Sequence, residues 1–219
     1  MGSASLTDDE QYQATCFVVI DFEATTPTGR RPEPIDIAAI ALRCAAGELR
    51  EVHRFTALMR PPEHAPVTPF DTEQTGITAA MVSEQPTAAE VLARLDGRLT
   101  EPPYLLVAHN APTEAGILYD YRQHCPTLAA IDFLDTVRLA RTVYPDLFSH
   151  RLDVLINHLR LRRPVDRHRA LPDVEITVEV FRHILAEGAR SGRWRTLRQL
   201  REDGLYQAKS GKPEQEALF

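Results

Sequence analysis

The sequence predicts an α/β domain with a mixed β-sheet flanked by helices. Three runs rich in β-branched and apolar residues follow one another early in the chain, and a fourth apolar strand later alternates with helical segments. A length of 219 residues fits one sizeable domain. We expect that domain at residues 14–203, with an N-terminal tail at 1–13 and a flexible, polar C-terminal tail at 204–219.

The first half of the chain predicts a meander of three strands followed by a loop. Gly47 marks the turn between the second and third strands, and four prolines between residues 61 and 69 favour a loop. The predicted strands are ATCFVVID (14–21), PIDIAAIALRC (34–44) and LREVHRFTALMR (49–60).

The second half predicts helices around one more strand. In PTAAEVLARLDGRL (86–99) the apolar residues are spaced three and four apart, and Pro86 suits a first helical turn. A short buried strand, YLLVAHN (104–110), precedes a helix opened by Pro112. The later helices are predicted at 112–125, 149–161 and 172–188.

The composition is that of an ordinary globular protein, with 43% hydrophobic and 26% charged residues. No apolar run approaches the length of a membrane span, so we expect no membrane partner. The N-terminus lacks the basic-then-apolar layout of a signal peptide. The three scattered cysteines argue against a disulfide framework or a cysteine-rich zinc site and favour a reducing, cytoplasmic setting.

Basic residues are concentrated in one part of an acidic chain. Residues 151–201 hold 12 Arg and 6 acids, although the whole chain has a net charge of −6. The stretches RLRRPVDRHR (160–169) and RSGRWRTLRQLR (190–201) contribute most of these arginines. They are either a solvated helical face or a surface that binds phosphates, because the arginine fork matches phosphate oxygens.

Asp21 and Glu23 end the first predicted strand. Residues i and i+2 of a strand face the same side, roughly 7 Å apart. Two acids so placed either leave the sheet into solvent or hold a divalent cation, which removes their mutual repulsion. Carboxylate oxygens suit Mg²⁺ or Mn²⁺, whereas zinc prefers His or Cys ligands.

Further candidate ligands occur where strands end and helices begin. Glu114 lies in the first turn of the helix after YLLVAHN, and Asp173 follows His168 by five residues at the start of the last long helix. Each acid alone has an ordinary explanation at a helix N-terminus. Together they occupy the positions where active sites of α/β proteins assemble.

With these motifs, residues 15–188 resemble the DEDDh 3′–5′ exonucleases, the family of the proofreading subunit of bacterial DNA polymerase III. The resemblance implies an RNase H-like fold. Three family motifs are matched by DFEAT (21–25), VAHNAPTEAGIL (107–118) and HRALPD (168–173). The stretches TGITAAMV (75–82), LDTVRLARTVYP (134–145) and SHRLDVLINHLRL (149–161) are also similar to family sequences.

The second motif departs from the family pattern. Relatives usually carry Asp four residues after the Asn that Asn110 matches, and this chain has Glu114 there. Thr113 replaces the usual aromatic residue before that acid, and Thr26 and Pro27 stand where a Gly often follows the first motif. Glutamate keeps the charge and adds one methylene, so rate and substrate preference are affected more than reaction type.

The resemblance implies a metal-dependent hydrolysis of phosphodiester bonds at 3′ ends. Two Mg²⁺ or Mn²⁺ ions would be bound, one by Asp21, Glu23 and Asp173 and the other by Asp21 and Glu114. His168 would act as general base toward the attacking water. The substrate-binding residues would be Phe22, Ala24, Thr25, His109 and Asn110.

Single-stranded DNA is the expected substrate, and two alternatives are open. The first is an exonuclease for the 3′ ends of RNA or for short oligonucleotides, since DFEAT occurs in relatives that act on either nucleic acid. The second is a catalytically degenerate interaction module, because Glu114 replaces the usual Asp.

The C-terminal residues QEALF (215–219) resemble the QxxLF peptide by which bacterial replication and repair proteins bind the DNA sliding clamp. Gln215, Leu218 and Phe219 would be the contact residues, on a polar tail that serves as a tether. Short patterns also arise by chance. If the motif is functional, the substrate is DNA and the protein acts in replication or repair.

Overall fold

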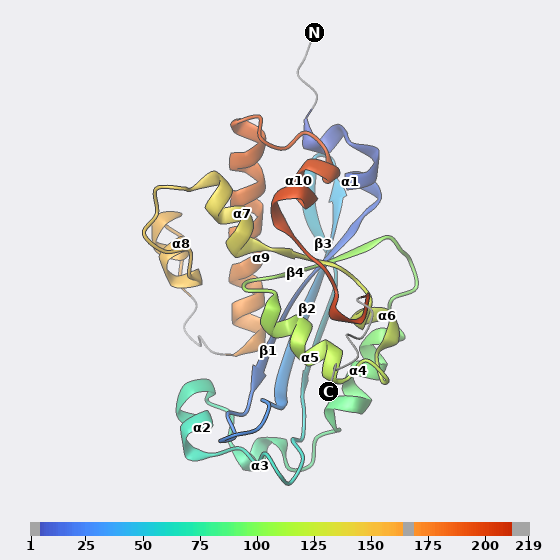
Figure 1. The fold of residues 1–219 in the computed structure, drawn as a ribbon, viewed down its shortest axis with the longest axis vertical. Coiled ribbons are helices and arrows are strands. Elements are labelled where there is room, and N and C mark those ends of the chain that lie inside the picture. Colours follow the sequence, from blue (N-terminus) through green and yellow to red (C-terminus); the bar gives the residue numbers. More distant parts are fainter. Residues whose placement is uncertain (1–4, 164–168, 212–219) are drawn as a thin grey trace, which may run out of the picture.

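The structure is a computed structural model that describes residues 5–163 and 169–211. Its centre is a six-stranded sheet with the strand order β3-β2-β1-β4-β5-β6 (Figure 1). The strands are β1 (Cys16–Ala24), β2 (Pro34–Ala45), β3 (Glu48–Leu58), β4 (Tyr104–Ala108), β5 (Phe133–Asp135) and β6 (Leu205–Tyr206).

The sheet is mixed, as the sequence predicts. Strands β1, β2 and β3 form an antiparallel meander, β4 and β5 run parallel to β1, and β6 is antiparallel to β5. The carboxyl ends of β1, β4 and β5 therefore meet at the same edge of the sheet. In α/β proteins this edge is where ligands bind.

Ten α-helices and two short 3-10 helices lie in the described part of the chain. The 3-10 helices are η1 (Leu6–Asp8) and η2 (Lys209–Gly211). The α-helices are α1 (Glu10–Ala14), α2 (Pro69–Thr75), α3 (Ala79–Val82), α4 (Ala88–Asp96), α5 (Pro112–Asp120), α6 (Pro126–Ala129), α7 (Thr136–Val143), α8 (Leu152–His158), α9 (Ala170–Arg190) and α10 (Leu197–Gly204).

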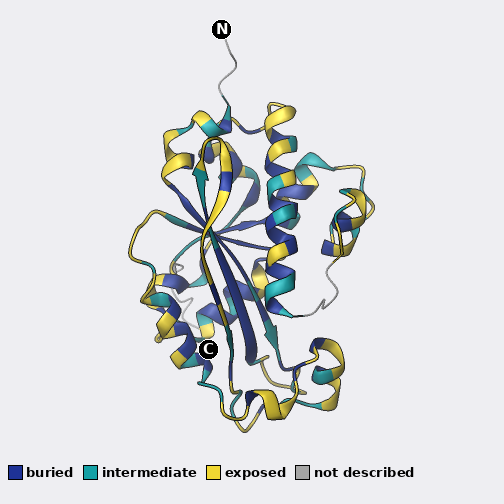
Figure 2. Cartoon of the chain, turned by 180° about the vertical axis from the view of Figure 1, so that it is seen from behind, coloured by how far each residue is buried: buried dark blue, intermediate teal, exposed yellow. Residues whose placement is uncertain are grey.

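Each face of the sheet has its own hydrophobic core, because side chains alternate along each strand. On one face Phe17 and Val19 of β1 pack with α1 and with helices α7 to α10. On the other face Val18 and Ile20 pack with α4, α5 and α6. Figure 2 shows that the buried side of the long helix α9 faces the sheet, while its other side is exposed.

The predicted domain boundaries at residues 14 and 203 are too narrow. Leu6 and Tyr12 are both buried in the core, so residues 5–14 are part of the domain. Strand β6 extends the sheet beyond residue 203, and the backbone N–H of Ala208 donates to Asp132 at 3.1 Å. The predicted C-terminal tail therefore contains ordered residues up to 211.

Several local expectations are corrected. Strand β1 runs from Cys16 to Ala24, so Glu23 lies within the strand as Asp21 does, whereas the predicted strand ends at Asp21. Pro86 precedes the N-cap Thr87 of α4, whereas Pro112 opens α5 as predicted. The proline-rich stretch predicted as a loop ends at α2, which begins at Pro69. Among the described helices, none combines the length and apolarity needed to cross a bilayer.

Candidate active site

Asp21 and Glu23 share the face of β1 that α9 covers. Phe22, between them, packs in the core on the opposite face, which is the alternation expected of a strand. Strand β2 pairs with this end of β1, with Ala38 opposite Asp21 and Asp36 opposite Glu23. The ladder of backbone hydrogen bonds therefore holds both carboxylates at defined positions.

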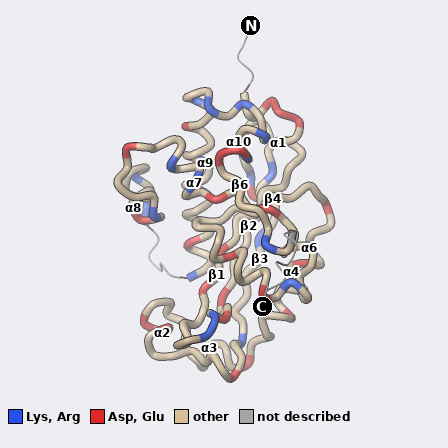
Figure 3. Tube along the Cα trace, in the orientation of Figure 1, with Lys and Arg blue, Asp and Glu red and all other residues tan. Residues whose placement is uncertain are grey.

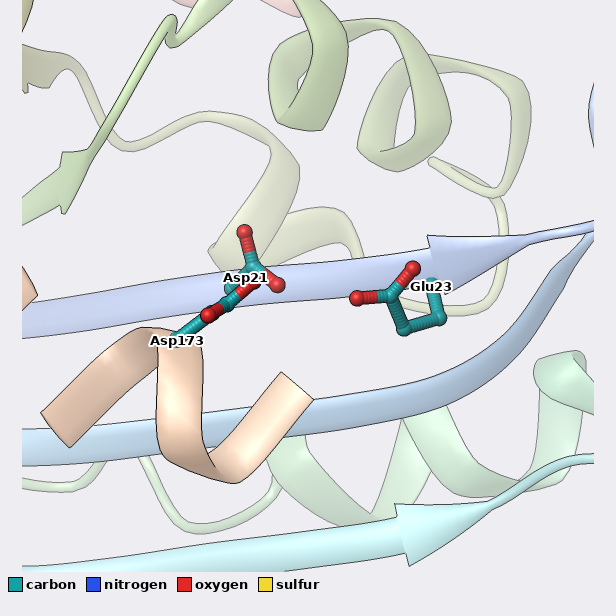
Figure 4. A group of neighbouring side chains, drawn as sticks. All are labelled: Asp21, Glu23 and Asp173. Atoms are coloured by element: carbon teal, nitrogen blue, oxygen red, sulfur yellow. The ribbon is translucent and has the colours of Figure 1, made fainter. Parts of the chain in front are cut away.

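Asp173 reaches the same place from α9. It lies in the first turn of that helix and is buried. Its carboxylate and those of Asp21 and Glu23 each offer a ligand atom, and these atoms all lie within 4.8 Å of one another. Figure 4 shows the Asp173 carboxylate against Asp21, with the Glu23 side chain directed toward both. The structure thus brings together three of the predicted ligands.

Glu114 is the fourth acid of the prediction and is also buried, with 4% of its surface exposed. It lies in the first turn of α5, at the end of the loop that follows β4. Its Oε2 has no hydrogen-bond partner among the described residues. A buried carboxylate oxygen without a partner is costly, and a bound cation would remove that cost.

The site crowds four acids together, of which Glu114 and Asp173 are buried and Asp21 and Glu23 are half-buried. Burial and then the charges of Glu114, Glu23 and Asp173 raise the pKa of the Asp21 carboxyl well above its usual range. Burial raises the pKa of Glu114 to about 8, and the charges of Asp135 and Glu23 act in the same direction. Carboxylates that raise one another's pKa in this way repel each other when ionised, and a bound divalent cation would remove that repulsion.

The residues present fit Mg²⁺ or Mn²⁺. All four side chains offer carboxylate oxygens, which are hard ligands, and no sulfur ligand is among them. Glu114 is outside the group whose ligand atoms all lie within 4.8 Å of one another, so it is not close to all three of the other acids. Its charge is nevertheless the largest of those that raise the pKa of Asp21.

The predicted substrate-binding residues of the first motif are largely internal. Phe22 is buried in the core, so its side chain is not available to a substrate and only its backbone is. Thr25 is 1% exposed; its N–H donates to the Glu33 carbonyl at 2.9 Å and its hydroxyl accepts from the Glu33 N–H at 3.3 Å. Ala24, with intermediate exposure, ends β1.

The other two predicted substrate contacts follow β4. Asn110 is exposed and has a positive φ of 77°, and its Nδ2 donates to Thr113 Oγ1 at 3.0 Å. His109 has its Nδ1 2.8 Å from Thr136 Oγ1. Both residues lie at the carboxyl edge of the sheet, where β1 also ends. Their contact with a substrate stays a prediction.

Two predictions lie outside the described residues. His168, the expected general base, precedes the described residue Arg169. The expected clamp-binding residues Gln215, Leu218 and Phe219 follow residue 211.

Two buried acids near the site are not among the residues predicted from the sequence. Asp36 is 5% exposed and binds Arg169 and the start of α9. Asp135 is 4% exposed, ends β5 and accepts from the N–H groups of Val137 and Asn110. The available signal was the same for both: a single acid at or within an apolar strand sequence.

The two arginine-rich stretches do not form one surface. Helix α9 has 21 residues and is therefore about 30 Å long. The stretch at 190–201 lies beyond its far end, where Arg193 pairs with Asp203 and Arg201 pairs with Asp132. In the described part of 160–169, Arg169 precedes the near end of α9 and binds Asp36, whereas Arg163 pairs with Asp153 of α8. Figure 3 shows these as separate groups of basic residues.

The family profile described as Exonuclease matches residues 18–181. The chain therefore belongs to the exonuclease family, which confirms the predicted resemblance. The 3′-5′ exonuclease DinG of Bacillus subtilis is 36% identical over 191 residues, covering 84% of this chain and 19% of that protein. A PolC-type DNA polymerase III of Clostridium perfringens is 32% identical over 166 residues, covering 76% of this chain and 11% of that protein.

The chain thus spans less than a fifth of the length of these relatives. Solved structures show the same fold. The nuclease domain of 3′hExo, a DEDDh family member bound to rAMP, has a TM-score of 0.68 at 21% identity, covering 83% of this chain and 96% of that chain. Exonuclease X in complex with 5′ overhanging duplex DNA has a TM-score of 0.61 at 24% identity, covering 85% and 98%. The predicted RNase H-like fold is confirmed.

Proposed function

We propose that this protein is a divalent-metal-dependent 3′–5′ exonuclease that removes nucleotides from the 3′ end of single-stranded DNA. The observation that carries the proposal is the convergence of Asp21, Glu23 and Asp173 within 4.8 Å, with buried Glu114 nearby. Family membership supports the reaction class. The proposal concerns this chain, which matches only one part of its longer relatives.

The acids would hold the cations and so set where the scissile phosphate binds. Asp21, Glu23 and Asp173 would hold one ion, and Asp21 and Glu114 a second. When bound, the ions supply charge neutralisation at the phosphate and lower the pKa of a coordinated water. Without them the four carboxylates repel the phosphate backbone, so nucleic acid should bind weakly until the cation is bound.

His168 is proposed as the general base. An imidazole titrates near neutrality and can accept a proton from water. The support is its position in HRALPD, five residues before the ligand Asp173. Asn110 and the backbone of residues 22–25 would contact the 3′-terminal nucleotide, since they lie at the same edge of the sheet.

The choice of DNA is supported by the relatives above 30% identity, a DNA polymerase and a 3′-5′ exonuclease. The motif QEALF, if it binds a clamp, supports DNA independently. A cytoplasmic setting, in replication or repair, would follow from the same substrate. RNA is the competing substrate, because the structural neighbour 3′hExo was solved with rAMP.

The test is a comparison of single-stranded DNA, RNA of the same sequence and a dinucleotide, each incubated with the protein and Mn²⁺. The proposal predicts that DNA is degraded fastest. Faster degradation of RNA or of the dinucleotide would replace the substrate but keep the reaction. Degradation of none of them by folded protein would favour the degenerate interaction module.

A further inference from the structure

Asp36 joins strand β2 to the start of α9 across a long separation in sequence. Its Oδ2 accepts a hydrogen bond from Arg169 Nε at 3.0 Å and from the backbone N–H of Ala170 at 3.4 Å, across 133 and 134 positions. The same carboxylate is 5% exposed, and Arg169 is its only charged partner among the described residues.

The Asp36 carboxylate provides a hydrogen-bond acceptor for the first N–H group of α9. The first N–H groups of a helix have no partner within the helix. Arg169 is the N-cap residue and makes no side-chain capping bond of its own. Pro172, the third helical residue, has no N–H to satisfy. The Ala170 N–H is therefore capped by a carboxylate of the sheet instead of by a neighbouring residue.

The capped turn carries the metal ligand. The N–H of Asp173 donates to the carbonyl of Arg169 at 3.2 Å, so a shift of Arg169 is transmitted directly to Asp173. On the other side, Asp36 is the register partner of Glu23 in the β1–β2 ladder. Asp36 is thus fixed relative to the ligands of β1 and is bonded to the turn that bears the ligand of α9.

We propose that the Asp36–Arg169 pair is a positioning unit that sets the distance of Asp173 from Asp21 and Glu23, and thereby the affinity of the site for its divalent cation. This inference rests on the proposed function, because it assigns a role around the same metal site. Neither residue is among the proposed ligands of the cation. Groups that orient metal ligands typically account for about 10- to 100-fold in metal affinity or activity.

The charges of the pair act on the site separately from its geometry: removing the Arg169 guanidinium would by charge alone favour the cation, so weaker Mn²⁺ binding by Arg169→Gln would report the positioning role. The negative charge of Asp36 lies near enough to contribute to the crowding of acids at Asp21. The guanidinium of Arg169 neutralises it at contact distance. Loss of Arg169 alone would leave an unpaired buried acid beside the cluster, which costs more than loss of the whole pair.

The experiment measures Mn²⁺ binding to the whole chain without nucleic acid, from the loss of the free-ion signal in electron paramagnetic resonance. Arg169→Gln and Asp36→Asn are each expected to weaken Mn²⁺ binding by about 10- to 100-fold. Arg169→Lys, which keeps the charge, should recover part of the loss. Asp36→Asn combined with Arg169→Gln should weaken binding by much less than the product of the two single effects.

The matched control is Arg193→Gln, which breaks an Arg–Asp ion pair beyond the far end of α9, at 2.8 Å from Asp203. Arg193→Gln should leave the Mn²⁺ affinity unchanged. This should hold even if it lowers the unfolding midpoint as much as Arg169→Gln does. Mn²⁺ binding of all variants is measured at a temperature well below their unfolding midpoints. If Arg169→Gln does not fold, Arg169→Lys and Asp36→Asn test the positioning role in its place.

Wild-type Mn²⁺ affinity in folded Asp36→Asn and in the Arg169 variants would overturn the positioning role and leave the proposed function intact. Failure of the wild-type chain itself to bind Mn²⁺ would overturn both, so the two failures are distinguishable.

Discussion

Glu114 lies close enough to Asp21 for its charge to raise the pKa of the Asp21 carboxyl, while the Oε2 of Glu114 itself is buried without a hydrogen-bond partner among the described residues. The two acids come from β1 and α5, and the loss of contact with water raises the pKa of both carboxyls above the usual range. A protein retains such a pair at a cost in stability. A divalent cation bound between them would remove that cost.

Replacing Asp21 should remove metal binding and activity without loss of the fold. Asp21→Asn keeps the shape of the side chain and removes the carboxylate proposed to be shared by both ions. We expect the nuclease rate to fall by at least about 100-fold. We also expect the rise in unfolding midpoint on adding Mn²⁺ to disappear, because only ligand that binds the folded state stabilises it. A folded Asp21→Asn protein with robust activity would refute the assignment of the metal site.

Glu114 should behave as a ligand and not as an ordinary first-turn acid. We expect Glu114→Ala to lower the rate by at least about 100-fold. Glu114→Asp restores the residue usual in the family and should retain activity, with a changed preference between Mg²⁺ and Mn²⁺. Single-turnover rates of the three proteins decide the matter. As the control, Glu187→Ala removes an acid from the far end of α9 and should leave the rate unchanged.

The pH dependence of stability should reveal the buried acids. The pKa of Glu114 is raised from 4.5 to about 8 in the folded chain. Between these values the folded chain binds the proton that the unfolded chain releases. Stability from this group is therefore fully present below pH 4.5 and is lost as pH rises through about 8. The Asp21 shift acts in the same direction.

Thermal unfolding in chelator measures this effect. The midpoint of the wild-type chain should fall by several degrees between pH 6 and pH 8, and that of Glu114→Gln should fall less. Mn²⁺ should raise the wild-type midpoint more at pH 8 than at pH 6, because the cation competes with the protons. If the unfolding midpoints of the two metal-free proteins depended equally on pH, the pKa of Glu114 would not be raised in the folded chain.

Packing at the far end of α9 offers a test of the fold alone. A Cβ on Gly188 would lie 2.1 Å from Cε3 of Trp194, the single tryptophan of the chain. Trp194 is 1% exposed, so the ring has little room to move. Gly188→Ala should therefore destabilise the protein by about 1–3 kcal/mol. Urea unfolding followed by tryptophan fluorescence measures this directly, and an unchanged midpoint would contradict the close contact.

The clamp peptide can be tested apart from the domain. A fluorescent peptide of residues 205–219 should bind a bacterial sliding clamp with a Kd of about micromolar, since a short segment loses its freedom on binding. A control peptide with Leu218→Ala and Phe219→Ala should not bind. Equal binding of the two peptides would remove the clamp as a partner and weaken the preference for DNA.

The sequence located the acids of the site because they follow a pattern that can be counted along the chain. Asp21 and Glu23 share one face of a strand, and Glu114 and Asp173 each open a helix. Asp36 could not be found this way. It lies within an apolar strand sequence, and its partner Arg169 is 133 positions away. Only the folded chain brings the two together.

The missed elements are those held by tertiary contacts. Strand β6 has two residues in a polar stretch and exists because it pairs with β5. Helix α2 begins in a proline-rich segment, and its residue Asp71 accepts hydrogen bonds from Thr68 and from Thr26, which directly follows the first motif. Local propensity is too weak a signal for elements this short.

Metal-dependent removal of nucleotides from the 3′ end is tested most directly by the direction and metal dependence of cleavage. Single-stranded DNA labelled at its 5′ end is incubated with the wild-type chain in Mn²⁺ or in chelator, and the products are separated by length. We expect progressive shortening from the 3′ end in Mn²⁺, and intact DNA both in chelator and with Asp21→Asn. Immediate release of the labelled 5′ nucleotide, or intact DNA with folded wild-type protein in Mn²⁺, would contradict the account.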